Sequence, residues 1–388
     1  MRVLVAFDKF KNSISAPMAC DIAAGAISSA RAPWEVDRCP LSDGGEGFAE
    51  ILTLSAGGSL LAAEADGPRG GKVAASFGIV SVDRIPGRAR ALLGAAAAGN
   101  GGSVGVVEMA AASGLALLDP GMRDPALATT RGTGQLILAA AAAGPRAILL
   151  GVGGSATHDL GLGALGALGI TFAGAGGETL DPPVPADWGA LRSIAGRVPC
   201  TLPPIFIACD VENPLLGPRG ALAVYGPQKG LRPEQAPALE SGGARIAQML
   251  CRHFGRPWDL ASRPGAGAAG GIAFGLMAAA GATLLPGFDF VASWLDLDER
   301  LAAADVVVTG EGRFDDSSLS GKGPGSLVRR ALALGKPVHV FAGQVALAED
   351  IPGLLTHAVA PPGMALAEAL AGAPALLSAA VHRAFAGR

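Results

Sequence analysis

Short apolar runs alternate with longer alanine-rich stretches along most of the chain. The short runs are rich in β-branched residues and end at glycine, serine or acidic residues, as buried strands of a parallel sheet do. We expect strands at residues 2–7, 35–39, 146–152, 204–208, 305–309, 337–342 and 356–360. We expect helices at residues 16–30, 46–56, 133–143, 160–168, 234–254, 268–281, 324–335 and 374–386. This alternation predicts an α/β fold around a mostly parallel sheet.

Two regions interrupt the alternation. Between about residues 66 and 120, short strands at 73–80 and 104–109 flank an alanine- and glycine-rich segment, which indicates an antiparallel or mixed region. Residues 173–204 are rich in glycine and proline and are expected to be irregular. We therefore predict an inserted domain with boundaries near residues 65 and 290.

Composition fits the α/β interpretation. Of the 388 residues 50% are hydrophobic, so the chain can bury a substantial core, and 58 are glycine. The glycines follow no three-residue period and lie between apolar runs, which excludes collagen-like and linker-like chains. They gather in loops where the backbone can approach an anion. These loops are residues 44–47, 132–134, 151–154, 265–271, 310–312 and 321–323.

The charge balance and the cysteines limit the partners and the compartment. The net charge is −3 and only 5% of residues are aromatic, which argues against a basic, base-stacking surface for nucleic acid. The five cysteines form no CxxC pair, which favours reduced thiols over disulfides or a zinc site. The uncharged stretch 264–288 contains glycines and prolines, so we interpret it as a loop and a buried helix. We expect a cytoplasmic protein that binds neither nucleic acid nor membrane.

The first predicted strand ends in an acid and two amines, Asp8, Lys9 and Lys11. Such groups at the carboxyl end of a strand can hold a metal or a hydroxyl proton together with an anion. The alternative is a solvated loop capped by Ser13 or Ser15. Lysine use supports a site, because only six of the 30 basic residues are lysine. Four of the six lie in polar, glycine-flanked segments: Lys9, Lys11, Lys229 and Lys322.

The second strand leads into two carboxylates, Asp43 and Glu46, around Gly44 and Gly45. The glycines let backbone amides approach a ligand, and Asp43 can accept a proton or bind a cation. The same spacing fits a capping box, in which Asp43 is the N-cap of a helix and Glu46 its third residue. The spacing alone leaves both interpretations open.

Two helix starts have the features of anion sites. Residues 153–155, Gly-Gly-Ser, follow a strand and precede a helix, so their amides and hydroxyl can converge on an anion. Asp159 in the same loop would repel a bare phosphate, which indicates an intervening Mg²⁺ or a hydroxyl partner. Arg131 opens another helix and suits a carboxylate or a phosphate; the alternative is a surface arginine beside a turn.

Charged residues also follow two later strands. Asp210 and Lys229 come after the fourth strand, each a weak signal by itself. The fifth strand leads into Glu311, Arg313 and Asp315. Charged groups at the end of a buried strand are costly to leave unpaired, which favours a nucleotide–metal site over a network of loop ion pairs.

Standard motifs are absent or out of context. The chain has no GxxxxGK[ST] phosphate loop. Residues 265–270 match the dinucleotide pattern GxGxxG, but no strand precedes them, and residues 101–105 match GxSxG but precede a strand instead of following one. The five histidines have no metal-ligand spacing. The glycine loops, strand-end acids and sparse lysines together fit metal-assisted phosphoryl transfer best.

Nine ordered segments carry a resemblance that runs from residue 6 to residue 324. They are AFDKFKNSISA, LSDGGEG, EMAAASGLAL, TTRGTGQLI, GVGGSATHDLG, ACDVENPLLG, YGPQKG, PGAGAAGG and TGEGRFDDSSLSGKGP. In this order they resemble the bacterial glycerate kinase family, whose members phosphorylate D-glycerate with ATP and Mg²⁺. The resemblance implies 2-phosphoglycerate as the product, with 3-phosphoglycerate as the alternative.

The resemblance also implies an architecture and partners. It implies two α/β domains with the active site in the cleft between them. One is a Rossmann-like parallel-sheet domain built from both chain ends, residues 1–65 and 290–388, and the other is an inserted α/β domain, residues 66–289. The implied partners are D-glycerate and ATP, and a homo-oligomer stays open.

The family motifs indicate which residues act. We expect catalytic roles for Asp8, Lys11, Asp43, Arg131 and Asp210. We expect substrate or phosphate binding by Glu46, Gly153, Gly154, Ser155, Asp159, Lys229, Arg313 and Lys322. The expected metal ligands are Glu311 and Asp315. In this hypothesis Arg131 clamps the glycerate carboxylate, Asp8 or Asp43 is the general base, and Lys11 contacts the transferring phosphoryl group.

Several positions depart from the family pattern, and two other functions stay as alternatives. The departures are Phe7 for proline, Lys9 and Thr130 for serine, Gln135 for glutamate and His158 for asparagine. Lys9 adds a charge beside the expected site, which bears on acceptor or product preference. The alternatives are an NAD-dependent oxidoreductase that uses residues 265–270 and a non-catalytic sugar-acid binding protein.

Overall fold

The computed structural model describes residues 1–320 and 323–386, which fold into two compact units. The first unit comprises Met1–Asp43 and Val291–Arg388, and the second comprises Gly44–Phe290. Each unit has its own main sheet and its own hydrophobic core. The predicted architecture, a Rossmann-like α/β domain built from both chain ends with a second α/β domain inserted, is therefore confirmed.

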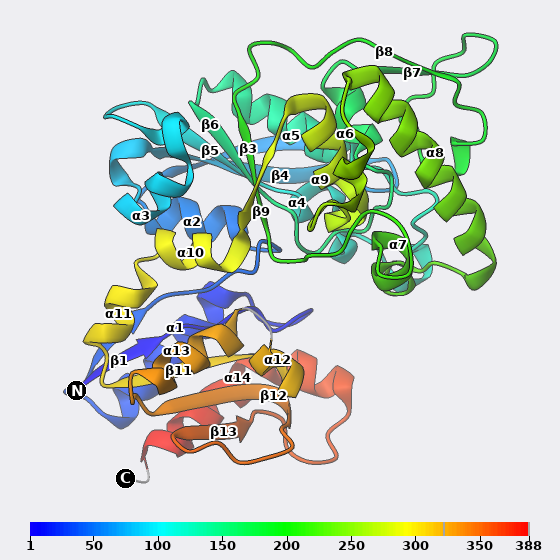
Figure 1. Ribbon diagram of the computed structural model, residues 1–388. Coiled ribbons are helices and arrows are strands. Elements are labelled where there is room, and N and C mark those ends of the chain that lie inside the picture. The colour runs from blue at the N-terminus through cyan, green and yellow to red at the C-terminus, as the bar shows by residue number, and fades with distance from the viewer. Residues whose placement is uncertain (321–322, 387–388) are drawn as a thin grey trace. The chain divides into compact units, whose positions relative to one another are not determined.

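The sheet of the first unit has five parallel strands in the order β13-β12-β11-β1-β2 (Figure 1). Their bounds are β1 (Arg2–Val5), β2 (Glu35–Arg38), β11 (Val306–Asp315), β12 (Val338–Ala346) and β13 (Leu354–Ala358). β1 lies between β2 and β11, and the apolar run Val3 to Phe7 is fully buried. The carboxyl ends of these three strands therefore meet at one edge of the sheet, where open α/β sheets bind ligands.

Helices cover this sheet. They are α1 (Ala16–Ala30), α11 (Leu297–Ala303), α12 (Asp316–Ser320), α13 (Pro324–Ala333) and α14 (Leu366–Ala386). Ser15 caps α1, because its Oγ accepts a hydrogen bond from the amide of Met18. Within the described residues, α14 alone is long and apolar enough to cross a membrane. It packs on α1 and β12 and buries Leu377, Val381 and Phe385 in the core of the unit.

The main sheet of the second unit has six strands in the order β10-β9-β6-β5-β4-β3. Their bounds are β3 (Ser59–Asp66), β4 (Lys72–Ser81), β5 (Ser103–Glu108), β6 (Ala147–Gly151), β9 (Ile205–Cys209) and β10 (Thr283–Pro286). The pairs from β5 to β10 are parallel, whereas β3, β4 and β5 pair antiparallel. The prediction of a mixed region is thus confirmed. A short antiparallel pair, β7 (Thr171–Ala173) and β8 (Ser193–Ala195), lies in the segment expected to be irregular.

Nine α-helices are assigned in the described part of the second unit and at its end. They are α2 (Phe48–Ser55), α3 (Gly87–Leu92), α4 (Ala110–Ser113), α5 (Arg131–Ala142), α6 (Leu162–Ala167), α7 (Ala221–Tyr225), α8 (Ala236–Phe254), α9 (Ala268–Ala280) and α10 (Gly287–Trp294). Short 3₁₀ turns include η6 (Pro227–Lys229), η7 (Pro233–Gln235) and η8 (Trp258–Ser262).

The uncharged stretch 264–288 contains α9, which lies in the core of the second unit, as predicted for a buried helix. Its first turn is distorted: Gly270 has a φ of 72°, and a Cβ there would collide with the carbonyl of Thr157. The GxGxxG match at residues 265–270 follows η8 rather than a strand. It therefore lacks the strand–turn–helix context of a dinucleotide site.

The division between the units differs from the expected one at its first boundary. The hydrophobic pattern predicts that boundary near residue 65, whereas the first unit ends at Asp43. The reason is pairing that the local pattern does not reveal: β3 pairs with β4 along its whole length, and α2 packs on β4 and β5. Residues 44–65 consequently belong to the second unit. The second boundary follows Phe290.

Candidate active site

Asp8, Lys9 and Asp43 form a charged cluster at the carboxyl edge of the first unit's sheet. The amide of Asp8 donates to the carbonyl of Gly310 on β11 at 3.2 Å, and Asp8 Oδ1 accepts a hydrogen bond from the amide of Lys9 at 2.7 Å. Lys9 Nζ lies 2.9 Å from Asp43 Oδ1 and 3.9 Å from Asp8 Oδ1. One ammonium thus lies between two carboxylates. This agrees with their positions after neighbouring parallel strands, whose carboxyl ends meet at one edge of the sheet.

Burial and repulsion shift the proton affinity of this cluster. Burial raises the pKa of Asp8 to about 7; Asp43 adds to the rise, and the Lys9 ammonium opposes it. The pKa of Glu311 is also raised, first by burial and then by Asp315 and Asp43, against the effects of Ser318 and Lys11. A carboxyl group that titrates near neutral pH can exchange a proton with a substrate hydroxyl. Asp8 has this property.

The carboxyl-terminal part of β11 carries other predicted site residues of the first unit. Arg313 and Asp315 pair with each other, Nε to Oδ2, at 2.8 Å. The amide of Asp315 donates to Ser318 Oγ at 3.2 Å, so this end of β11 is tied to α12. Lys11 is exposed. Lys322, which the sequence also suggested for this site, lies outside the described residues.

The acids of the first unit fit a magnesium ion that arrives with a nucleotide. Within residues 1–320 and 323–386, no group of three or more His, Cys, Asp and Glu side chains could hold a metal by itself. Mg²⁺ does not require one, since it is commonly bound by one or two carboxylates with phosphates and waters completing the octahedron. Glu311 can offer a carboxylate oxygen to the ion, and its pKa is raised by burial and by the neighbouring acids Asp315 and Asp43. A divalent cation would relieve the repulsion among these acids.

In the second unit, Arg131 opens α5 but already has acidic partners. Its Nε lies 3.0 Å from Asp66 Oδ2, and its NH1 pairs with Asp181. Asp66 is further held by Lys72 Nζ at 2.8 Å and by Gln135 Nε2 at 2.9 Å, and the Lys72 hydrogen bond is the largest cause of its lowered pKa. The guanidinium is therefore ordered at the helix start by two carboxylates that the sequence did not associate with it.

The loop after β6 has the anion-binding groups that its sequence suggested, although fewer than expected. The amide of Gly153 donates to Gly44 O at 2.8 Å, and the amide of Ala156 donates to Ser113 O at 2.9 Å, so both are used inside the fold. The amides of Gly154 and Ser155 make no such bond within the part of the chain that the structure describes. These two amides and the Ser155 hydroxyl remain for an anion.

Asp159 lies beneath this loop and is fully buried. Its Oδ2 accepts from Thr130 N and Thr130 Oγ1, both at 2.8 Å, and from Gly163 N at 3.1 Å. Its Oδ1 accepts from Gly161 N at 3.0 Å. Burial raises the pKa of Asp159 while these hydrogen bonds oppose the rise. The carboxylate thus ties the loop to the start of α5 and α6, and a soluble ligand cannot reach it.

Lys229, a weak signal in the sequence, reaches the same loop from η6. Its side chain is buried, and Nζ donates to Ser155 Oγ and to the carbonyl of Thr157, both at 2.8 Å. Burial lowers the pKa of Lys229 to about 7, with Asp159 opposing. Burial also lowers the pKa of His158 to about 3, and Lys229 adds to that shift. The position of this amine depends on the chain that follows it, residues 230–235.

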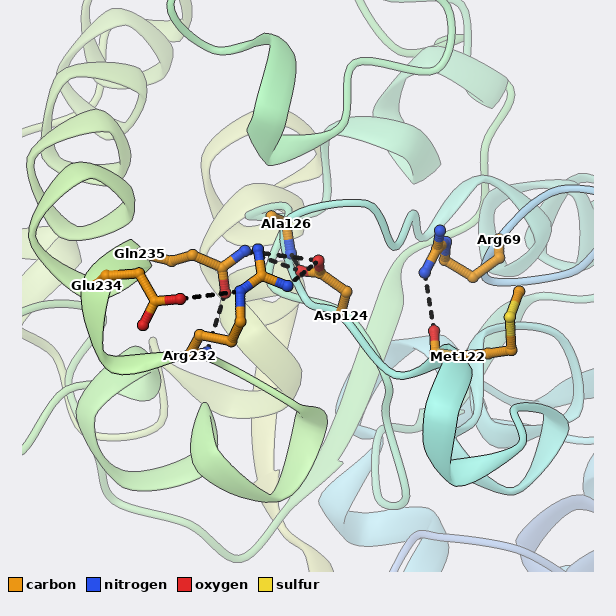
Figure 2. A network of polar contacts seen from close by, with 7 residues as sticks. All are labelled: Arg69, Met122, Asp124, Ala126, Arg232, Glu234 and Gln235. Atoms are coloured by element: carbon orange, nitrogen blue, oxygen red, sulfur yellow. Dashed lines mark hydrogen bonds and ion pairs between the residues drawn. The ribbon is translucent and has the colours of Figure 1, made fainter.

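A polar network fixes that part of the chain, as Figure 2 shows. Asp124 Oδ2 pairs with Arg232 NH1 at 3.4 Å, and Gln235 Nε2 donates to Asp124 Oδ1 at 3.4 Å. Gly230, with a φ of 88°, packs so closely on the carbonyl of Arg123 that a Cβ would collide with it. Asp124 was not among the predicted site residues, because its partners lie about a hundred residues away along the chain, where local patterns carry no signal.

Glu46 and Asp210 each contact another residue of the second unit. The Glu46 carboxylate lies against Gly154: a Cβ there would be 2.6 Å from Glu46 Oε1. Asp210 Oδ2 accepts from the amide of Phe288 at 2.8 Å. The capping-box interpretation is wrong, because α2 begins at Phe48 after Gly47, with no side-chain cap.

Comparisons with known proteins show which family the chain is similar to. A family model described as the glycerate kinase family matches residues 3–386. A glycerate kinase of Haemophilus influenzae is 35% identical over 365 residues, covering 92% of this chain and 89% of that protein. A glycerate 2-kinase of Escherichia coli is 34% identical over 365 residues, with the same coverage. A solved structure described as glycerate kinase 2 of Salmonella typhimurium LT2 is 33% identical, with a TM-score of 0.74, and covers 100% of this chain and 96% of its own.

The resemblance predicted from the motifs and the predicted enzyme class, a phosphotransferase, are both confirmed by these matches. The chain belongs to the glycerate kinase family.

Proposed function

We propose that the protein transfers the γ-phosphoryl group of ATP to the C2 hydroxyl of D-glycerate, with Mg²⁺, and releases 2-phosphoglycerate and ADP. The observation that carries the proposal is the buried Asp8, which lies beside Asp43 and Lys9 and has its pKa raised to about 7. A phosphoryl acceptor hydroxyl must lose its proton, and a base that titrates near the working pH suits that step.

The first unit supplies the proton acceptor and most of the charge neutralisation in this proposal. Asp8 takes the hydroxyl proton as the glycerate oxygen forms its bond to the γ-phosphorus and the bond from that phosphorus to the β-γ bridging oxygen breaks. Asp43 is the second candidate base, and Lys11 contacts the transferring group. Glu311 and Asp315 would hold Mg²⁺, which when bound neutralises nucleotide oxygens. Arg313 holds Asp315 in place at 2.8 Å.

The second unit supplies anion-binding groups. The amides of Gly154 and Ser155 and the Ser155 hydroxyl bind a phosphoryl oxygen. Lys229 supports this site, because its Nζ donates to Ser155 Oγ at 2.8 Å. Arg131 binds the glycerate carboxylate. Because Asp66 is also held by Lys72 and Gln135, the substrate carboxylate would displace the other acidic partner, Asp181.

Three further residues complete the proposed set. Asp159 holds the loop through buried hydrogen bonds. Glu46, which lies beside Gly154, and Asp210, which accepts from the amide of Phe288, are the other acids that we propose for the site in the second unit. We propose a cytoplasmic location, in keeping with reduced cysteines, none of which forms a disulfide in the described residues.

The test is ³¹P NMR of a reaction containing the protein, ATP, MgCl₂ and D-glycerate. We expect ADP and the phosphomonoester signal of 2-phosphoglycerate, and no turnover when Mg²⁺ is chelated. A 3-phosphoglycerate signal would replace the proposed product by its alternative. Glycerate binding without ADP release would instead support a non-catalytic sugar-acid binding protein.

A further inference from the structure

Lys229 is a buried amine with no counter-ion among the residues that the structure describes. Its side chain is 3% exposed, and none of the carboxylates in the described chain lies within ion-pair distance of Nζ. The nearest acid that influences it is Asp159, whose two oxygens already accept four hydrogen bonds from residues 130, 161 and 163. A buried charge without a partner is strongly unfavourable, as is a buried ion pair that has lost one member.

The hydrogen bonds of Lys229 match a neutral amine. An NH₂ group has two N–H bonds, and Nζ has two acceptors, Ser155 Oγ and Thr157 O, both at 2.8 Å. An ammonium has three N–H bonds, and no third acceptor lies within hydrogen-bond distance among the described residues. The protein alone therefore satisfies the neutral form and leaves one donor of the charged form unpaired.

The other groups around Nζ do not supply the missing charge. His158 is buried and has its pKa lowered to about 3, so it is neutral, and its ring packs at 6.2 Å from that of Trp188. The titratable groups that act on Lys229 are thus Asp159 and His158, one already hydrogen-bonded and the other neutral.

The groups next to the amine are those of an anion site. Ser155 accepts the bond from Lys229, so its own proton is available to a ligand, and the amides of Gly154 and Ser155 are unused in the described chain. An oxyanion bound by these groups would supply both a negative charge and the third acceptor.

We propose that Lys229 is neutral in the free protein and takes up one proton when a phosphoryl or carboxylate oxygen binds at Gly154 and Ser155. Binding of an anion at this loop is then coupled to pH through one buried amine. The inference rests on the proposed function only for the identity of the anion, because it requires an oxyanion at the loop but no turnover.

The expected proton uptake depends on pH with a definite sign. In the free protein the pKa of Lys229 is about 7, and a bound anion raises it toward the ordinary lysine value. At pH 8 the free amine is mostly neutral, so binding takes up about 0.9 proton. At pH 6 the free amine is already mostly charged, and the uptake falls to about 0.1 proton.

Isothermal titration calorimetry measures this uptake. ADP, inorganic phosphate and D-glycerate are each titrated into the full chain at pH 6 and pH 8, in two phosphate-free buffers of different ionisation enthalpy. We expect at least one probe to bind with about 0.9 proton taken up at pH 8. Lys229→Met should abolish that uptake, and the matched control Lys336→Met should retain it, since within the described residues Lys336 Nζ donates only to Ala302 O, at 3.3 Å.

Several results would overturn the inference. These are no binding of any probe at millimolar concentration, no uptake at pH 8, and uptake that persists in Lys229→Met. If Lys229→Met does not fold, ¹⁵N NMR of lysine Nζ in the unmodified protein shows whether one amine with a free-state pKa near 7 becomes an ammonium on adding the probe; no such amine would also refute it. A protein that makes phosphoglycerate without uptake refutes only this inference, whereas uptake without phosphoglycerate refutes only the proposed function.

Discussion

At the scale of single residues, Asp8 combines two properties that seldom occur together on a surface loop. It is 9% exposed, and it lies between the charges of Asp43, Lys9 and Glu311. Its raised pKa means that it is ionised, and able to accept a proton, only above about pH 7. The free energy that burial costs is the reason the group is basic enough to be useful.

Asp8→Asn should lower kcat by about 10² to 10⁴ fold with little change in either KM, because a general base acts in the transition state. A coupled assay for ADP release measures both constants. Asp298→Asn, in an exposed pair with Arg330, is the matched control and should behave like the unmodified protein. Near-normal kcat in Asp8→Asn would exclude Asp8 as the base and leave Asp43.

Lys9→Met should move the acidic limb of the kcat profile to higher pH. In the unmodified protein we expect kcat to fall as pH drops through about 7, because the proposed base Asp8, whose pKa burial raises to about 7, becomes protonated there. Lys9 lowers that pKa, so its removal raises it, and kcat at pH 7 should fall roughly two- to tenfold while recovering at pH 9. Lys9→Arg keeps the cation and should keep the limb in place. A limb at the same pH in Lys9→Met would show that this ammonium does not act on the titrating group.

Arg131→Ala should raise KM for glycerate far more than KM for ATP. Losing a charged hydrogen bond worth about 1.5–3 kcal/mol corresponds to roughly a 10- to 150-fold change. Steady-state kinetics with each substrate varied in turn measures the two constants. Arg330→Ala, which also breaks a pair with an aspartate, controls for the loss of surface charge. Equal increases in both KM values would contradict a carboxylate clamp.

At the scale of elements, Asp159 acts as a buried link. One carboxylate accepts hydrogen bonds from Thr130, before α5, and from Gly161 and Gly163, at the start of α6. The sequence pattern placed Asp159 in the anion loop and predicted contact with a ligand. Its partners show why a motif residue can be structural: helix N-terminal amides attract a side-chain carboxylate as readily as a phosphate.

Asp159→Ala should lower the free energy of unfolding by about 3–5 kcal/mol, because several buried donors lose their acceptor. Urea unfolding followed by circular dichroism measures the change. Asp159→Asn keeps one acceptor oxygen, so its free energy of unfolding should lie between those of the unmodified protein and Asp159→Ala. The matched control is Asp298→Ala on an exposed pair, which should change the free energy by less than about 1 kcal/mol. A similar small change in Asp159→Ala would show that the buried bonds are replaceable by water.

The elements also show how far the sequence could predict this protein. Local patterns located β1, the acid that follows it and the first half of β11, since period and turn residues are local signals. Glu311 and Asp315, expected after the strand, lie within β11, which runs to Asp315 because it pairs with β12 as far as Ala346. They could not show that Asp66 and Asp181 pair with Arg131, or that Lys229 meets Ser155, because those contacts join distant parts of the chain. The composition gave one hint of Lys229, a lysine in a chain that mostly uses arginine.

At the scale of the whole chain, the two units are stabilised by separate cores. The core of the first unit includes Phe341 and Phe385, and that of the second includes Phe172 and Trp188. The local pattern misplaced the first boundary because strand pairing, and not hydrophobicity, assigns residues 44–65 to the second unit. Stability should accordingly respond to mutation unit by unit.

Hydrogen exchange with mass spectrometry tests this division. Asp159→Ala should speed amide exchange in peptides from residues 44–290 and leave those from 1–43 and 291–386 unchanged, because its hydrogen bonds lie within the second unit. Phe385→Ala is the reciprocal variant: its ring is 4% exposed and packs 5.9 Å from Trp34, and the loss of about 3–5 kcal/mol should appear in the first unit alone. Exchange that rises equally in both units for either variant would mean that the chain unfolds as one cooperative body.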